Sequence, residues 1–192
     1  MKFTQLAPDA FEKIQLNAGV LLSEFDPETA EFDPSTDIVG ASSGGIAFEA
    51  TPNYVDFGED IDNCPTGTKE LNKLDYWEVL MSGSMVTIDP AAAALMAGAA
   101  DVTDTKVTPR VDVLDKDYKD LWWVGDYSSD NTDENGGFVA IHMTNTLSTG
   151  GFKLQSNNKG KGMFEFEFKG HYSIKDLSKV PFEIYVKKGG AA

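Results

Sequence analysis

LWWVGDYSSDNTDENGGFVAIHMTNTLSTGGFKLQSNNKGKGMFEFEFKGHY, residues 121–172, decides the fold. Runs of β-branched and aromatic residues are interrupted by Gly, Asn and Ser clusters at intervals of about ten residues, a pattern typical of consecutive antiparallel strands. Near its end three phenylalanines alternate with charged residues, so one face of that strand is apolar and the other faces water. These predicted core residues are Phe164, Phe166 and Phe168, and the wet face is Glu165, Glu167 and Lys169.

Further strands are expected on both sides of this stretch. A first strand lies within residues 11–25, and others cover residues 44–51, 76–88, 107–113 and 182–187. Gly83, in the middle of 76–88, permits a bulge or a bend. After this strand, Asp89 is expected to cap a short helix with Pro90 at its first position, an Ala-rich body and Gly98 near its end.

The pattern predicts a mainly β (α+β) protein: an antiparallel β-sandwich or half-barrel of about seven to nine strands with one short flanking α-helix. No Pro/Gly/Ser-rich linker divides the sequence, so a single domain is expected over residues 1–192. Two loops are expected to project, at about residues 26–40 and 52–73. The composition of 52–73 predicts poor order in an isolated subunit.

Charge is distributed unevenly along the chain. Residues 1–149 hold eight bases and 27 acids, whereas the remaining residues hold eight lysines and four acids, which gives net charges of −19 and +4. Between Lys13 and Lys69 there are eleven acids and no base. Such a surface repels phosphates, which argues against binding nucleic acid in a basic groove. The simplest interpretation of these acids is a solubilising surface.

The sequence offers little support for catalysis, metal binding or export. Cys64 is the single cysteine, and His142 and His171 lack the spacing of metal or triad motifs. Asn131, Asp133, Asn135 and Gly136 imitate the start of a calcium loop, but its twelfth position is His142, so a polar turn is favoured. Glu165 and Glu167 lie on one strand face at a separation compatible with a glycosidase pair. A strand face exposed to water needs the same alternation, so that interpretation is favoured over catalysis. The first eleven residues do not form a signal peptide, and no apolar run is long enough to span a membrane.

Adjacent tryptophans begin the deciding stretch. In an extended strand Trp122 and Trp123 point to opposite faces, so one is expected in the core and the other is a candidate for a subunit contact.

The order of several motifs resembles the major tail tube protein of long-tailed (siphovirus-type) bacteriophages and prophages. The motifs are Trp122-Trp123-Val124-Gly125-Asp126, the strand with Ile141-His142-Met143, the turn Thr149-Gly150-Gly151-Phe152, the final Gly170-His171-Tyr172, and upstream GGIAFEAT at 44–51. The resemblance implies the tail tube fold, which is shared with the tube proteins of contractile tails and type VI secretion.

The resemblance also implies a structural, non-enzymatic virion protein without cofactors, made in the bacterial cytoplasm and assembled into the tail. Six copies would form a ring around a continuous inner β-barrel, and rings would stack into a tube through which DNA passes without specific binding. Other partners would be the tape measure protein, the tail terminator and distal tail or baseplate proteins. The long loop would pack against the next ring through Asn53, Tyr54, Phe57, Asp60, Asp62, Thr66 and Lys69.

A different class of function remains open at this stage. A carbohydrate-binding or adhesin-like β-sandwich would have a similar strand pattern, and it would expose a platform of Trp or Tyr side chains beside polar loops.

Overall fold

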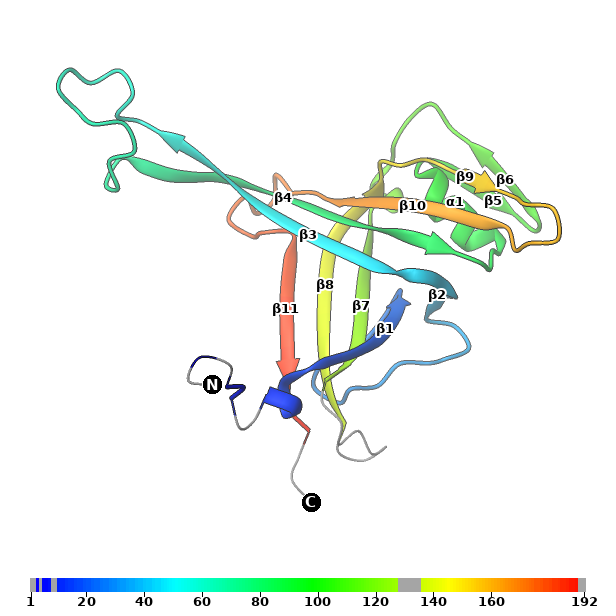
Figure 1. Ribbon diagram of the computed structural model, residues 1–192. Helices are drawn as coiled ribbons and strands as arrows, with labels where there is room; N and C mark the ends of the chain where they lie inside the picture. Colours follow the sequence, from blue (N-terminus) through cyan, green and yellow to red (C-terminus); the bar gives the residue numbers. More distant parts are fainter. Residues whose placement is uncertain (1–2, 4, 8–9, 128–135, 190–192) are drawn as a thin grey trace.

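The computed structural model describes residues 3, 5–7, 10–127 and 136–189 of the chain (Figure 1). The described residues form a nine-stranded antiparallel sheet, a two-stranded sheet and one α-helix. The strands of the large sheet are β1 (Gln15–Leu22), β2 (Ile38–Gly40), β3 (Ser42–Asp56), β4 (Asn72–Met85), β7 (Lys119–Tyr127), β8 (Gly137–Ser148), β9 (Lys153–Gln155), β10 (Met163–Gly170) and β11 (Phe182–Lys187). The small sheet pairs β5 (Ala100–Thr103) with β6 (Lys106–Pro109). The helix is α1 (Pro90–Ala97), and two 3-10 turns are η1 (Ala10–Lys13) and η2 (Asp115–Asp117).

The large sheet folds over itself into two layers. A four-strand layer consists of β1, β7, β8 and β11, and a crossing layer consists of β3, β4, β10 and β9. Figure 1 shows the strands of the first layer running up and down the picture and those of the second running across it. The sheet is open, because the strands at its ends do not pair with each other in the described part of the chain.

Strand β8 belongs to both layers. One of its edges pairs with β7, while the other pairs first with β11, through residues 138–143, and then with β10, through residues 146–148. Asn145 lies between these two pairings and has a φ of +49°, in the left-handed region that Asn tolerates better than most residues. The strand therefore changes partner at a local bend.

The main core lies between the layers. Its buried members come from β1, β4, β7, β8, β10 and α1, and are Leu21, Val79, Met81, Met85, Met96, Leu121, Met143, Phe166 and Phe168. Phe164 is half-buried and packs against them, while Glu165 and Glu167 are exposed on the other side of the strand. Gly83 leaves room for Phe166, because a Cβ at that position would lie 2.9 Å from the Phe166 ring.

A second apolar cluster covers the opposite side of the four-strand layer. Leu22, Trp122, Phe138 and Ala140 are buried there, and the connection after β1 packs Phe25 and Ala30 onto them. We name the two sides of this layer after the adjacent tryptophans of β7. The Trp123 face continues into the main core, and the Trp122 face carries the second cluster.

Helix α1 has the predicted ends. Asp89 is the N-cap, where its carboxylate accepts a hydrogen bond of 2.7 Å from the N–H of Ala92, and Pro90 is the first helical residue. Gly98 ends the helix. Met96 joins α1 to the main core.

Several boundaries differ from those predicted. Residues 52–56 and 72–73 belong to β3 and β4, so the expected loop at 52–73 is a shorter loop, 57–71, at the tip of a long hairpin. Pro52 is compatible with a strand because β3 lies at the edge of the sheet, where a missing N–H is tolerated. The expected loop at 26–40 ends in β2, which pairs with β1. The hairpin of β5 and β6 stands where a single strand at 107–113 was predicted, and the described strands exceed the predicted seven to nine.

The irregularity expected at Gly83 lies in the neighbouring strand. Ser42 pairs with Met85 and Ile46 with Gly83, so β3 contains extra residues there. These include Gly44 and Gly45, with φ of +85° and +88°, a conformation that glycine adopts without strain.

Candidate functional site

Both outer strands of the four-strand layer leave hydrogen-bonding edges available. Strand β11 pairs only with β8, and β1 pairs with β7 on one side and with β2 only at Leu21 and Leu22 on the other. Within the described residues, no strand covers the remaining edge of β11 or the edge of β1 over residues 15–20. Unpaired edges of this kind are templates for pairing with another chain.

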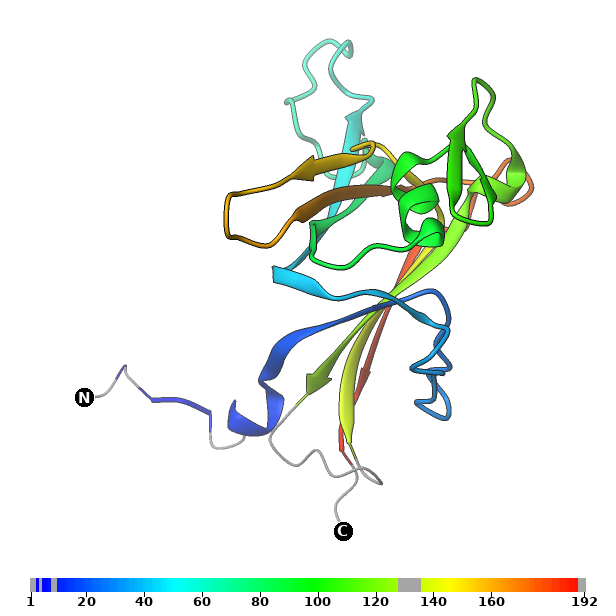
Figure 2. The same ribbon diagram turned by 90° about the vertical axis from the view of Figure 1, so that its right-hand side faces the viewer.

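The hairpin of β3 and β4 reaches far from the rest of the molecule, as both views show (Figure 1 and Figure 2). Tyr54 is 61% exposed and Phe57 64%, although both are large and apolar. Tyr54 pairs directly with Leu74, which is also exposed, and Ile61 and Tyr76 add to the apolar surface of the hairpin. Solvent-exposed apolar groups on a projecting element indicate a surface that is covered by a partner.

The tip of this hairpin has its own hydrogen bonds. The Asp56 carboxylate accepts 2.7 Å and 2.8 Å hydrogen bonds from the N–H groups of Gly67 and Gly58, and these two bonds lower the pKa of Asp56. The N–H of Phe57 donates to the carbonyl of Leu71 at 3.0 Å. These hydrogen bonds tie the loop 57–71 to the ends of β3 and β4.

The seven residues predicted for ring stacking all lie on this hairpin. Asn53 and Tyr54 are in β3, and Phe57, Asp60, Asp62, Thr66 and Lys69 are in the tip. Asn53 is half-buried and the other six are exposed. Leu74, Tyr76 and Ile61 were not predicted, because local sequence does not distinguish an apolar strand residue that packs on its own core from one left exposed.

The two tryptophans proposed as core and contact residues are both covered within the chain. Trp122 is 8% exposed and stacks on His142, while the half-buried Trp123 donates from Nε1 to the carbonyl of Ala18 at 3.0 Å. The third tryptophan, Trp77, is half-buried against the main core. The exposed aromatic side chains that the structure offers to a partner include Tyr54, Phe57 and Tyr76.

The two faces of the four-strand layer differ in the charged side chains that they carry. Asp126 and Lys187 pair with Phe138, and Glu183 with His142, which places all three charged residues on the Trp122 face. The connection 23–37, which covers part of this face, carries six acids and no base. Hydrogen bonds from Glu28 N–H to Asp26, and from the hydroxyl and N–H of Ser35 to Asp33, lower the pKa of both carboxyls.

The Trp123 face carries no charged side chain in the described stretches 121–127, 137–143 and 182–187. Ile184 pairs with Ile141 and Val186 with Val139, so all four share this face with Trp123. Ile184 is 55% exposed and Val186 is 58% exposed. The crossing layer covers the upper part of this face and leaves its β11 end open.

A cavity of about 960 Å³ lies between α1, β2 and the beginning of β7. Its lining mixes apolar residues of α1 with carboxylates and with the stacked Trp122 and His142. The His142 ring nitrogens lie 3.5 Å from Asp120 Oδ2 and 3.8 Å from Glu183 Oε2. This lining contains no cysteine, and its one hydroxyl pair, Ser23 and Thr36, lies on the acidic connection.

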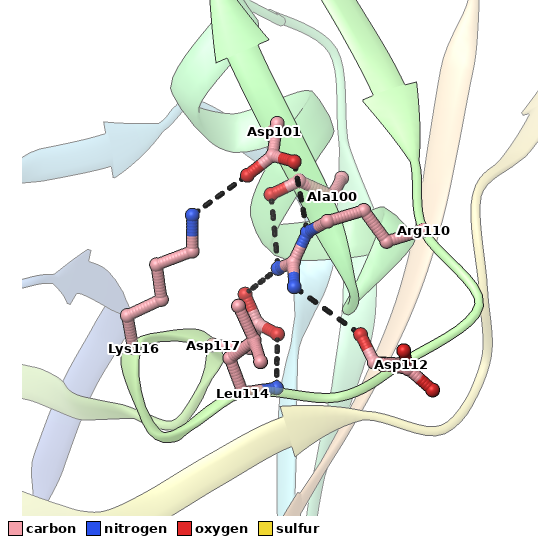
Figure 3. Close-up of polar contacts among 7 residues, drawn as sticks. All are labelled: Ala100, Asp101, Arg110, Asp112, Leu114, Lys116 and Asp117. Carbon is pink, nitrogen blue, oxygen red and sulfur yellow. Dashed lines mark hydrogen bonds and ion pairs between the residues drawn. The ribbon is translucent and has the colours of Figure 1, made fainter.

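An ion-pair cluster beside this cavity ties β5, β6 and η2 together (Figure 3). The buried Asp117 carboxylate accepts hydrogen bonds from Arg110 and, at 2.8 Å, from the N–H of Leu114. Arg110 Nε also lies 3.1 Å from Asp101, which accepts 2.6 Å from Lys116. The Lys116 hydrogen bond and then the Arg110 charge lower the pKa of Asp101. These contacts stabilise the local packing of β5, β6 and η2 against one another.

The remaining sequence candidates are not brought together into a site. Among the described residues no three His, Cys, Asp or Glu side chains are placed to hold a metal ion. Asn131, Asp133 and Asn135 of the calcium-like pattern lie outside the described residues. In the same part of the chain, no helix has both the length and the apolar character needed to cross a membrane.

Comparison with known proteins gives a limited result. No protein-family model matches the sequence, and no curated protein sequence matches it. One solved chain with a similar fold comes from the virion of a native gene transfer agent particle. It is 9% identical, the match covers 81% of this chain and 92% of that chain, and the TM-score is 0.43.

Proposed function

We propose that this protein is the major tail tube protein of a long-tailed bacteriophage, prophage or phage-like particle. It is a structural virion protein that assembles as stacked hexameric rings into a hollow tube. The observation that carries the proposal is the four-strand layer with both edges open, combined with a hairpin that extends beyond the molecule. Both features leave groups unsatisfied in one chain that other copies can satisfy.

Ring closure follows from the open edges. In the four-strand layer neighbouring strands are antiparallel, so β1 and β11 run in opposite directions. The β11 edge of one copy can therefore continue into the β1 edge of the next as an antiparallel pair. Repetition around a ring closes the sheets into one barrel and removes every open edge of this layer.

The charge distribution supports one orientation of the layer in the wall of the tube. The crossing layer packs on the upper part of the Trp123 face, so the Trp122 face is the side that can line the bore. That face carries Asp120, Asp126 and Glu183 beside a single lysine of the layer, Lys187, and the acidic connection 23–37 adds six acids and no base. Negative charge along the bore keeps DNA phosphates from binding, so the genome slides through.

The hairpin of β3 and β4 is the proposed stacking element between rings. In this proposal its exposed apolar residues are buried when one ring packs on the next. The tape measure protein, the tail terminator and distal tail or baseplate proteins are the further partners expected in the tail. The subunit is made in the bacterial cytoplasm and resides in the virion.

The carbohydrate-binding alternative has less support. It requires an exposed platform of Trp or Tyr side chains. The three tryptophans are buried or half-buried, and the exposed Tyr54 and Tyr76 lie on opposite sides of the hairpin, so they do not form one platform.

A shortened hairpin tests the proposal. Asp56 pairs with Asn72, so residues 57–71 can be replaced by Asn-Gly, a sequence suited to a two-residue β-hairpin turn. We expect the full chain to form tubes when it is concentrated, visible by negative-stain electron microscopy, and the shortened chain to form rings that do not stack. A matched control exchanges Glu165 for Gln on the wet face of β10. An invariant monomer of the full chain up to millimolar concentration would contradict the proposal.

A further inference from the structure

We propose that the open end of the Trp123 face, formed by Val139, Ile141, Ile184 and Val186, receives the β3–β4 hairpin of another copy in the adjacent ring. This inference rests on the proposed tube and adds to it the surface on which the hairpin docks.

The docking surface is apolar and has no charge of its own. Ile184 and Val186 are on β11, and their cross-strand partners Ile141 and Val139 are half-buried on β8. Ile141 packs against the main core, as does the rest of this face toward the crossing layer, so Ile184 and Val186 form the exposed part of the docking surface. An uncharged, β-branched sheet surface that the described residues leave exposed is the kind of surface that another apolar element stabilises.

The hairpin has a matching apolar side. Pro52 and Trp77 form a cross-strand pair, and Trp77 packs on the main core. Tyr54 lies two residues beyond Pro52, so it points to the same side, and its partner Leu74 does so as well. The pairing skips Asp75, and this bulge places Leu74 on that side.

Charge favours this pairing of surfaces. Residues 53–76 of the hairpin hold six acids and two lysines, a net charge of −4. Residues 174–188 contain β11 and the loop before it. Without Glu183 and Lys187, which lie on the Trp122 face, they hold three lysines and one acid, a net charge of +2. An acidic hairpin is therefore attracted to the lysines on either side of β11, and repelled by the acidic Trp122 face.

Length also fits. Strand residues advance about 3.3 Å each, so Pro52 to Asp56 span roughly 13 Å, and the tip extends beyond them. Figure 1 shows the hairpin passing the β11 edge of its own four-strand layer. The tip therefore lies away from the docking surface of its own chain and is available to another copy.

Disulfide cross-linking tests the contact. In a Cys64→Ser background, Leu74→Cys combined with Ile184→Cys should give a ladder of covalent multimers on mild oxidation of tubes. The matched control combines Leu74→Cys with Glu165→Cys, an exposed position on the far face of β10, and should give none. Tubes that form without a Leu74–Ile184 ladder would overturn this inference and leave the proposed function standing. Failure of the Cys64→Ser chain to form tubes would overturn both.

A second pair of variants tests the charge argument without cross-linking. Ile184→Asp and Ile184→Lys both remove the apolar side chain from an exposed position. If the acidic hairpin docks there, Ile184→Asp should raise the protein concentration needed for tube formation by about tenfold or more over Ile184→Lys. Equal effects of the two variants, with folding unchanged by circular dichroism, would contradict the docking of the hairpin on this face.

Discussion

The imidazole of His142 lies flat on the indole of Trp122, with ring centroids 3.9 Å apart and ring planes 4° from parallel. The Asp120 and Glu183 carboxylates flank the imidazole on the neighbouring strands. Burial lowers the pKa of His142, and this effect outweighs the attraction of the proton to the two carboxylates. His142 is therefore a neutral, packed residue of the Trp122 face.

This arrangement predicts a pH dependence of stability. An unfolded His has a pKa of about 6.5, and the folded value is lower, so the unfolded chain binds the proton more tightly. The contribution of His142 to stability is full above about pH 6.5 and declines as the pH falls below it. Thermal unfolding of the wild type should lose stability between pH 7.5 and 5.5, and His142→Gln should lose less. Identical pH profiles for the two proteins would contradict this assignment. The window lies above the range in which Glu183, whose pKa is also lowered, becomes protonated.

The Arg110–Asp117 pair predicts an asymmetric response to mutation. Both side chains are largely buried, at 16% and 4% exposure. Asp117→Ala therefore leaves Arg110 with the more exposed Asp101 as its remaining ion-pair partner and should cost about 3 kcal/mol. Replacement of both residues, by Met at 110 and Leu at 117, should cost less than the single change. Denaturant unfolding measures both effects. Lys116→Ala, on the solvent side of the cluster, should have little effect, and equal losses in all three proteins would argue against the pair.

Phe166 tests the core. It is 3% exposed and stacks on Phe168 with centroids 5.1 Å apart. Phe166→Ala should destabilise the subunit by about 3–5 kcal/mol, and Phe166→Asp should unfold it because an unpaired charge is then buried. Glu165→Ala, one residue away on the wet face, is the control and should change stability by about 0.5 kcal/mol or less. Unchanged melting of Phe166→Asp would mean that the core lies on the other face.

Assembly should weaken as salt increases. The lysines near β11 and the acids of the hairpin attract each other across the proposed contact, and this attraction is screened when the Debye length falls from roughly 14 Å to 3 Å between 0.05 M and 1 M salt. Light scattering against salt concentration measures the effect. Assembly that is indifferent to salt would leave apolar contact and edge pairing as the main interactions. Lysines that outnumber carboxylates along the bore of a tube would refute the proposed orientation of the layer.

Local sequence was sufficient for much of this fold. The alternation at 164–168 identified the buried face of β10, and Asp89, Pro90 and Gly98 marked the ends of α1, because both signals depend on residues close in sequence. The hairpin was underestimated because Pro52 and the polar residues around it are typical of loops, and only the ladder with β4 shows that they form a strand. The stacking of Trp122 on His142 and the open Trp123 face depend on cross-strand register between distant segments, which a single sequence does not encode locally.

Asn145 lies in β8 at the point where the four-strand layer meets the crossing layer. The β3–β4 hairpin extends from the crossing layer. Because both layers share β8, the backbone direction at Asn145 affects the angle between the two layers. A small rotation there produces a larger displacement at the tip of the hairpin, which lies far from Asn145. In the proposed tube, a substitution at Asn145 would therefore alter the twist from one ring to the next, and with it the pitch and flexibility of the tube, without changing a residue at the contact.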